Sequence, residues 1–204
     1  MDYEGLMKES WMLTKKDLGT WIAATLVLIF GSIFIITFAP LSYGYNLMAV
    51  KSLKSEEIRL KDILEGFRLK NFFRSWIVVI AMMIPFVLLY VINSVIANIV
   101  VFFLFYSITL LILRGYGGIA ACKESSRIAI NNPVETIIIF VLYGVIVNIG
   151  FLALLIGTLV MLPFGEILLT GVTFDLAGEK RINKILIDDN SLQNENNPYE
   201  NLSE

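Results

Sequence analysis

Glu166 is the only ionisable residue between residues 136 and 174, a stretch that is otherwise uncharged. Thr170 and Thr173 follow it by four and seven residues, so on a helix the three side chains lie on one polar face. A carboxyl group in the apolar part of a bilayer costs about 2.5 to 3.5 kcal/mol on insertion scales, and it is normally paired, hydrated or neutral. With Asn148 on the preceding apolar segment, these residues form a predicted intramembrane polar site.

This polar site has two main interpretations. In the first, Glu166 is protonated or bonded to Asn148 and holds helices together. In the second, it binds an ion, a proton or a polar headgroup. A span boundary that leaves Glu166 near water is a third interpretation. The uncharged stretches contain no Lys or Arg to pair with it, so the sequence leaves these alternatives open.

The residues needed for most enzyme chemistry are missing from the sequence. There is no His, the commonest metal ligand and general base, and the single Cys, Cys122, cannot form an intramolecular disulfide. The apolar segments hold no pair of carboxylates, and GYGG at 115–118 lacks the G-x-G-x-x-G spacing of a nucleotide site. We therefore expect no catalytic residue, no metal and no cofactor.

The composition is that of a membrane protein. Of the 204 residues, 57% are hydrophobic and 17% are charged, against about a quarter charged in ordinary globular domains. Uncharged stretches cover residues 18–50 and 75–113, and only Glu166 interrupts a third at 136–174. A bilayer core of about 30 Å needs roughly 20 apolar residues as a helix, so each of the two longer stretches can form two spans joined by a tight turn.

This pattern predicts an all-α integral membrane protein, a six-helix bundle of three transmembrane hairpins in a single domain over residues 1–182. The first hairpin is the shortest, and Pro40 is expected to end or kink its first helix. The last residues, 183–204, are acidic and rich in Asn, which is typical of a disordered tail. The expected spans are residues 20–38, 40–53, 75–92, 97–114, 135–151 and 157–176.

The positions of the basic residues predict the orientation of the chain. All 16 Lys and Arg residues lie outside the uncharged stretches. If each stretch enters and leaves the membrane on one side, the basic segments share one face, which the positive-inside rule assigns to the cytoplasm. The start of the chain lacks the basic n-region of a cleaved signal peptide. We therefore predict a multi-pass protein of the cell membrane with both termini in the cytoplasm.

A short pattern of acidic, basic and then apolar residues precedes each uncharged stretch, starting at Glu9, Glu65 and Glu124. In residues 51–74, apolar residues recur near helical spacing between basic ones, as an amphipathic segment at the membrane interface requires. The repetition indicates a pseudo-threefold arrangement of the hairpins. Convergence is the alternative, because any chain with three hairpins needs similar entries into the membrane.

Three tryptophans are predicted to anchor the chain at the interface, where indole rings sit at the headgroup level: Trp11, Trp21 and Trp76. The basic residues near them are expected to contact anionic headgroups on the cytoplasmic face. The expected partners are therefore membrane lipids, with a homo-oligomer or a protein partner left open. No pattern in the sequence indicates nucleic-acid binding.

Four short motifs carry a resemblance to a known family. They are Ala39-Pro40-Leu41 with Gly44, ILEGF at 63–67, AACKESSRIAINNP at 120–133 and LPFGE at 162–166. Together they resemble a broad, largely uncharacterised family of bacterial and archaeal six-span membrane proteins, and they are similar to the membrane region of membrane-anchored glycerophosphodiester phosphodiesterases. The resemblance implies a fold, a membrane location and a link to lipids, and it brings no catalytic residues.

The leading hypothesis is a non-enzymatic polytopic membrane protein that acts as a lipid-interacting or partner-organising module. The alternative is a small transporter or channel whose polar path is lined by Glu166. The scarcity of buried charge argues against the alternative, because ion and proton routes usually need more than one ionisable step. An oligomer would weaken this objection, since it brings further copies of Glu166 to a shared axis.

Overall fold

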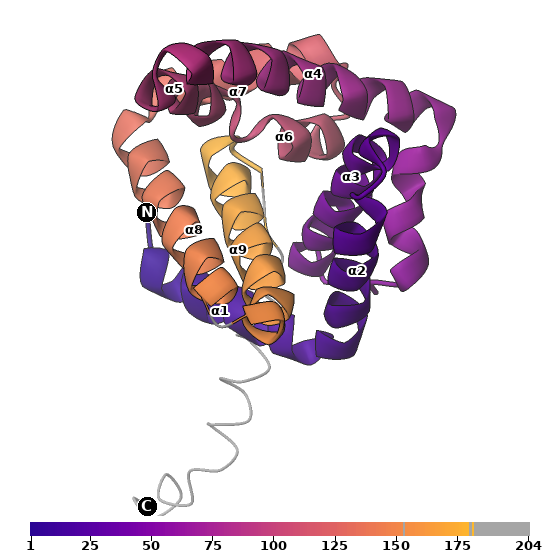
Figure 1. Ribbon diagram of the computed structural model, residues 1–204. Coiled ribbons are helices and arrows are strands. Elements are labelled where there is room, and N and C mark those ends of the chain that lie inside the picture. Colours follow the sequence, from indigo (N-terminus) through magenta and orange to yellow (C-terminus); the bar gives the residue numbers. More distant parts are fainter. Residues whose placement is uncertain (153, 180, 182–204) are drawn as a thin grey trace, which may run out of the picture.

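The described chain is built from helices (Figure 1). The computed structural model describes residues 1–152, 154–179 and 181, and this part contains no strand. The predicted all-helical fold is thereby confirmed, while the acidic tail expected at 183–204 lies outside the described residues. The helices are α1 (Tyr3–Lys16), α2 (Leu18–Gly31), α3 (Ile35–Leu53), the 3-10 helix η1 (Leu60–Phe67), α4 (Leu69–Ile92), α5 (Ser94–Leu104), α6 (Ser107–Leu113), α7 (Gly118–Asn131), α8 (Pro133–Leu152) and α9 (Leu154–Leu176).

Four segments of the described chain are long and apolar enough to cross a membrane. They are α4, the segment Ile96–Leu113 formed by α5 and α6, α8, and Gly157–Leu176 of α9. Helix α2 is apolar but has only 14 residues, a length of about 21 Å at 1.5 Å per residue. These segments support a multi-pass membrane protein, while the six spans and the threefold repeat stay predictions.

The first helical hairpin turns earlier than expected. Helix α2 ends at Gly31 and α3 begins at Ile35, so the predicted boundary at Pro40 is wrong, and this proline lies inside a helix. Proline has no N–H to bond the carbonyl four residues earlier, here that of Ile36. The indole Nε1 of Trp76 on α4 donates to this carbonyl at 3.3 Å. A neighbouring helix thus supplies the bond that the proline removes.

The predicted span 97–114 is interrupted at Phe105 and Tyr106, where α5 gives way to α6. Backbone groups freed by a break in an apolar setting need new partners. Ser125 of α7 serves both sides of the break, because its Oγ accepts from the Tyr106 N–H at 3.1 Å and donates to the Phe103 carbonyl at 2.8 Å. The break places Phe105 in the wall of the central cavity.

Where the sequence predicts an amphipathic segment at the membrane interface, the chain between α3 and α4 forms the 3-10 helix η1, which packs on α3. A Cβ atom on Gly44 would collide with the Ile63 carbonyl, and one on Gly66 would collide with the Pro40 carbonyl. Backbone therefore touches backbone at two points along this contact. The two glycines thus allow η1 to pack closely on α3.

Polar and apolar side chains separate on this segment. The buried Asp62 carboxylate pairs with Lys51 Nζ at 2.9 Å and accepts from the Arg59 N–H at 2.9 Å. Three apolar side chains remain exposed on the outer side of η1: Leu60, Leu64 and Phe67. The segment thus keeps an apolar outer face, as an interfacial position requires.

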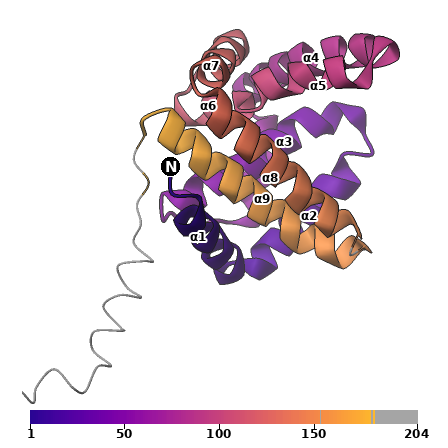
Figure 2. The ribbon, with the colours of Figure 1, turned by 90° about the vertical axis from the view of Figure 1, so that its left-hand side faces the viewer.

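Helix α9 lies in the middle of the bundle, with α8 along one side (Figures 1 and 2). It also contacts α1, α2 and α3, and apolar side chains such as Ile167 and Val172 are fully buried. At Gly171 the missing side chain leaves room for Leu6 of α1. Helix α1 is therefore part of the packed bundle as well as the first element of the chain.

Arg181 ties the end of this central helix to α1. Its guanidinium pairs with Glu9 on α1, and its Nε lies 2.9 Å from Oδ1 of Asp175 on α9. The Glu9 side chain is buried. Burial raises the pKa of Glu9 above its ordinary value, although the charge of Arg181 acts in the opposite direction. The link thus contains a carboxyl group that is costly to ionise.

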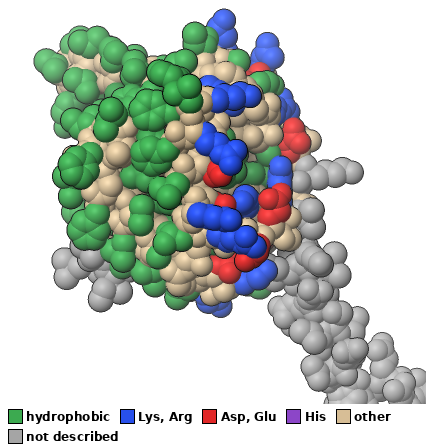
Figure 3. Space-filling model, turned by 90° about the vertical axis from the view of Figure 1, so that its right-hand side faces the viewer, with side chains coloured by type: hydrophobic (Ala, Val, Ile, Leu, Met, Phe, Trp, Pro, Cys, Tyr) green, Lys and Arg blue, Asp and Glu red, His purple; other side chains and the backbone are tan. Residues whose placement is uncertain are grey.

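Charged side chains gather on one side of the molecule. Figure 3 shows Lys, Arg, Asp and Glu in a band beside a broad apolar surface. In Figure 2, α1 and α7 lie on one side, while the turn between α4 and α5 and the end of α8 lie on the other. Large apolar side chains on α4 and α8 are exposed, including Ile84, Val91, Ile137 and Val141. Such a surface is typical of contact with lipid or with another protein.

Candidate functional site

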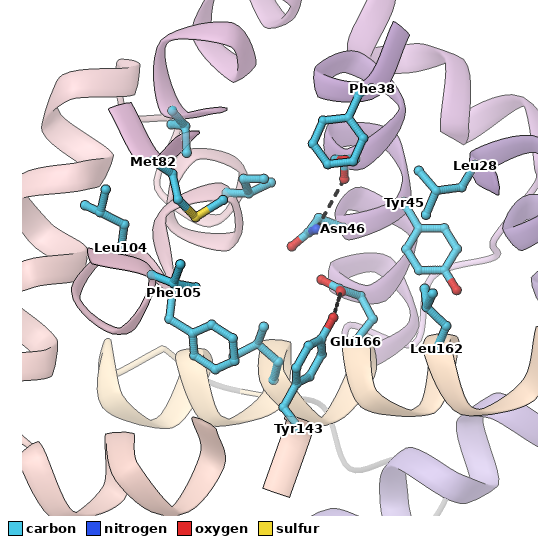
Figure 4. A pocket seen from close by; sticks show the side chains of 15 residues that line it. Leu28, Phe38, Tyr45, Asn46, Met82, Leu104, Phe105, Tyr143, Leu162 and Glu166 are labelled. Carbon is cyan, nitrogen blue, oxygen red and sulfur yellow. Dashed lines mark hydrogen bonds between the residues drawn. The ribbon is translucent and has the colours of Figure 1, made fainter. Parts of the chain in front are cut away.

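A cavity of about 290 Å³ lies between the helices of the bundle. Side chains from α2 to α6, α8 and α9 line it, and most of them are apolar. Figure 4 shows Glu166 and Asn46 pointing toward one another, with Tyr143 beside the carboxyl group. Glu166 stands at the middle of the Gly157–Leu176 candidate span, so the polar part of the cavity lies deep within the apolar layer.

The Glu166 carboxyl group has few partners for a buried polar group. Only 6% of the residue is exposed. Its Oε2 accepts from the Tyr143 hydroxyl at 3.5 Å, well beyond the distance of about 2.7 to 2.8 Å that is usual for such bonds. Its Oε1 is buried and has no hydrogen-bond partner among the described residues. A carboxyl oxygen in this state can accept a hydrogen bond from a molecule in the cavity.

Two other polar residues that line the cavity, Asn46 and Tyr45, have hydrogen-bond partners. Asn46 donates from Nδ2 to the Ser42 carbonyl at 3.2 Å and accepts at Oδ1 from Thr109 at 3.0 Å. The Tyr45 hydroxyl lies 2.9 Å from Oγ1 of Thr25. Among the described residues that line the cavity, Glu166 is therefore the one with a buried side-chain oxygen that lacks a partner.

The two threonines of the predicted polar face lie in α9 beyond the cavity wall. Both are fully buried. Thr173 donates from Oγ1 to the carbonyl of Leu169 at 2.8 Å, a bond within its own helix. The Oγ1 of Thr170 has no partner among the described residues. The polar face therefore exists, but only Glu166 on it faces the cavity.

Asn148 does not join this site. Its side chain is exposed on α8 and donates to the carbonyl of Gly144 at 2.7 Å, so the predicted bond between Asn148 and Glu166 is wrong. Tyr143, five residues before Asn148 on the same helix, faces Glu166 instead. Because α8 is apolar all round, the sequence pattern could not say which of its faces turns inward. A tyrosine in an apolar span was the signal for a buried hydroxyl.

The predicted interfacial tryptophans have three different environments. Trp11 is partly exposed and meets the ring of Phe164 edge-on at 5.7 Å. Trp21 is fully buried against Tyr45, with ring centroids 5.3 Å apart, so its assignment as an interfacial anchor is wrong. Trp76 is half-buried and serves α3, as described above. The Trp21 ring is buried because α2 packs against α3.

Comparisons with known proteins give no match. No protein-family model, no curated protein and no solved structure matches this chain. The resemblance carried by the four short motifs therefore stays a prediction. Two of those motifs are in contact, since Pro40 and Gly44 of α3 face the ILEGF segment at 63–67.

The ligand groups of this site are too few for a bound divalent metal. Mg²⁺ and Ca²⁺ take about six to eight oxygen ligands, of which proteins usually supply several carboxylates or carbonyls. Within the described residues, no group of three or more His, Cys, Asp or Glu side chains is placed to hold a metal ion. The cavity offers one carboxyl group and four other polar side chains among mostly apolar walls, which suits a molecule with a small polar head and an apolar body: Ser42, Tyr45, Asn46 and Tyr143.

Proposed function

We propose that this protein is a non-enzymatic, lipid-interacting membrane protein that binds an amphiphilic molecule in the cavity beside Glu166. The observation that carries the proposal is the buried Oε1 of Glu166, which faces an apolar cavity of about 290 Å³ without a partner among the described residues. A bound polar head satisfies that oxygen, and the apolar wall accommodates the rest of the molecule.

A purely structural role for Glu166 fits the site less well. Polar groups that join helices in membranes normally have their hydrogen bonds satisfied by those helices. Among the described residues, the carboxyl group has one hydrogen bond, the long one from Tyr143, and the adjacent Asn46 bonds to Ser42 and Thr109. The site therefore retains capacity for a ligand that helix packing has not used.

Transport along a polar path is the second candidate, and one observation bears on it. The buried hydroxyl of Thr170 extends the polar face of α9 beyond Glu166. Neither Thr170 nor Thr173 lines the cavity, and Asn148 points away from it. Binding is therefore the better supported function, because conduction needs a continuous series of polar steps.

The rest of the proposal concerns the membrane. The band of charged side chains would face the cytoplasm and contact anionic headgroups, with three hairpins entering from that side. In this arrangement α2 and α3 form a short first hairpin, which completes a six-helix bundle. Both termini would then be cytoplasmic. A homo-oligomer is compatible with the exposed apolar faces of α4 and α8.

Native mass spectrometry of the purified protein, released from gentle detergent or nanodiscs, tests the binding proposal. The wild type is expected to retain an amphiphile at fixed stoichiometry, and Glu166→Gln is expected to lose it, because the amide removes the charge and one acceptor site. Asn148→Ala is the matched control, since it changes an exposed polar residue of α8 outside the cavity. Identical spectra from wild type and Glu166→Gln would contradict the proposal.

A further inference from the structure

A second hollow adjoins the Glu166 cavity. It has a volume of about 430 Å³ and lies between the start of α3 and the α4–α5 pair. Phe38, Met82 and Val101 line both hollows, so they form a shared wall. We refer to the second hollow as the lateral groove. Apart from Ser32, its wall is built from apolar side chains, including Trp76 and Phe86.

The lateral groove opens on the apolar surface of the molecule. Ile35 and Met83 line it and are exposed by 76% and 46%. No charged side chain is among the described residues that line it. In a bilayer such an opening meets lipid chains, so the matching occupant is an alkyl chain that arrives from within the membrane.

The residues that line the Glu166 cavity indicate which kind of polar head that molecule has. None of the described residues that line the cavity is Lys, Arg or His, so a phosphate or carboxylate head would meet no positive charge there. An ionised Glu166 carboxylate would repel such a head and pair with a cation. Aromatic rings of Phe38, Phe105 and Tyr143 also line the cavity, and aromatic faces attract ammonium groups.

One side chain of the shared wall, Met82, is unbranched and flexible, and Phe38 faces both hollows. A chain that lies in the lateral groove and passes between Met82, Phe38 and Val101 reaches Glu166 without crossing the charged band. Head and chain are thus accommodated by two hollows that meet at one wall.

We infer that the ligand is a single-chain amphiphile with an amine head, which enters sideways from the lipid through the lateral groove and places its ammonium group beside Glu166. This inference rests on the proposed function and names its ligand class. It assigns the groove as the chain site and Glu166 with Tyr143 as the head site.

The test compares three probes of equal chain length on the full-length protein in nanodiscs: dodecylamine, dodecanol and dodecanoate. We expect saturable binding of one dodecylamine per chain, and affinity at least about 10-fold weaker for the other two, since neither places an ammonium group against Glu166 to form a charge-assisted hydrogen bond. Glu166→Gln should weaken dodecylamine binding by a similar factor. Equal binding of dodecanoate, or equal binding of dodecylamine by Glu166→Gln, would overturn the inference.

Val101→Trp tests the lateral route. The larger side chain fills the shared wall while Glu166 stays unchanged, and we expect it to weaken dodecylamine binding by at least about 10-fold. Ile137→Trp is the control, because Ile137 is exposed on α8 and lines neither hollow. Thermal unfolding of each variant identifies loss of fold, and Val101→Leu replaces Val101→Trp if the latter unfolds. Undiminished binding in a folded variant with a blocked wall would contradict entry through the groove.

These experiments separate two kinds of failure. If the wild type retains a co-purified amphiphile that depends on Glu166 but does not prefer dodecylamine, the amine head is wrong and the proposed function stands. If no amphiphile distinguishes wild type from Glu166→Gln, both the proposed function and this inference fail.

Discussion

At the level of single residues, Pro40 depends on a side chain from another helix. The Ile36 carbonyl that the proline leaves free accepts from Trp76 Nε1 at 3.3 Å. An unsatisfied carbonyl in an apolar setting is costly, so this bond lets α3 continue through the proline. The same helix carries Ser42, Tyr45 and Asn46 to the cavity within the next two turns. Trp76 thus contributes to the site although it does not contact Glu166.

We predict that Trp76→Phe lowers the free energy of unfolding by about 1 kcal/mol, the usual worth of a hydrogen bond. In a Pro40→Ala background the effect should be smaller, because alanine supplies an N–H for the Ile36 carbonyl. Unfolding of the four variants in detergent, analysed as a double-mutant cycle, measures the coupling. Additive effects of the two substitutions would show that the indole bond does not compensate for the proline.

Gly66 illustrates a residue that is required by close backbone contact. A Cβ atom there would collide with the Pro40 carbonyl, which is backbone and cannot rotate away. We expect Gly66→Ala to cost more than about 2 kcal/mol in unfolding free energy, as overpacking usually does. Gly144→Ala is the control, since nothing lies within 4 Å of a Cβ at that position. Similar stabilities for the two variants, measured by thermal unfolding in detergent, would contradict the close contact.

At the level of elements, the main structural question is how α1 is held on the central helix α9. Leu6 packs against Gly171, and Arg181 joins Glu9 to Asp175. Burial of Glu9 outweighs the attraction of Arg181, so the pKa of this carboxyl group is raised. An ion pair of this kind adds little net stability, although removing one partner alone is costly.

The raised pKa of Glu9 gives a pH prediction. Its pKa is higher in the folded protein than in the unfolded chain, so Glu9 contributes stability below the unfolded pKa, and that contribution is lost as pH rises through the folded pKa. We expect the unfolding free energy of the wild type, relative to Glu9→Gln, to fall from about pH 4 toward neutral pH. Denaturant unfolding across this range measures the difference. A difference that grows with pH would show that Arg181 dominates.

The breaks between elements follow the same physical rule. Where α5 ends, Ser125 of α7 bonds both freed backbone groups, and where Pro40 interrupts α3, Trp76 bonds the free carbonyl. Irregular backbone in an apolar layer is tolerated when protein groups satisfy it. Both irregular points lie close to the cavity, since Phe105 and Phe38 line its wall. The helices that line the cavity are therefore interrupted at these two points, where side chains of neighbouring helices bond the free backbone groups.

At the level of the whole molecule, the separation of charge from apolar surface predicts a topology. In a background with Cys122→Ser, we expect single cysteines at Lys54 and Lys123 to lie on the cytoplasmic side, and one at Leu152 to lie on the other. An impermeant maleimide should label Leu152→Cys in intact cells and the other two only after permeabilisation. Labelling of Lys54→Cys and Lys123→Cys from opposite sides would exclude the hairpin arrangement.

Of the four predicted site residues, only Glu166 lines the cavity, and it was accessible from the sequence because it is a charged residue in an apolar stretch. That placement has a high free-energy cost, so it marks a site whatever the fold. Its partners were not accessible in the same way. Tyr143 and Asn46 come from α8 and α3, which are far apart in the chain, and the predicted partner Asn148 lies on a different face of α8. The rotation of an all-apolar helix is decided by packing and not by its own pattern.

The sequence by itself determined that this chain is helical and suited to a membrane, because a bilayer demands long apolar segments whose backbone bonds close internally. Only the tertiary structure decided where the helices bend and what Glu166 faces. The position of the first turn, the burial of Trp21 and the docking of η1 on α3 all depend on contacts between distant segments. Hydrophobicity is a local property of the sequence, whereas a cavity is created by several helices that fail to fill the space between them.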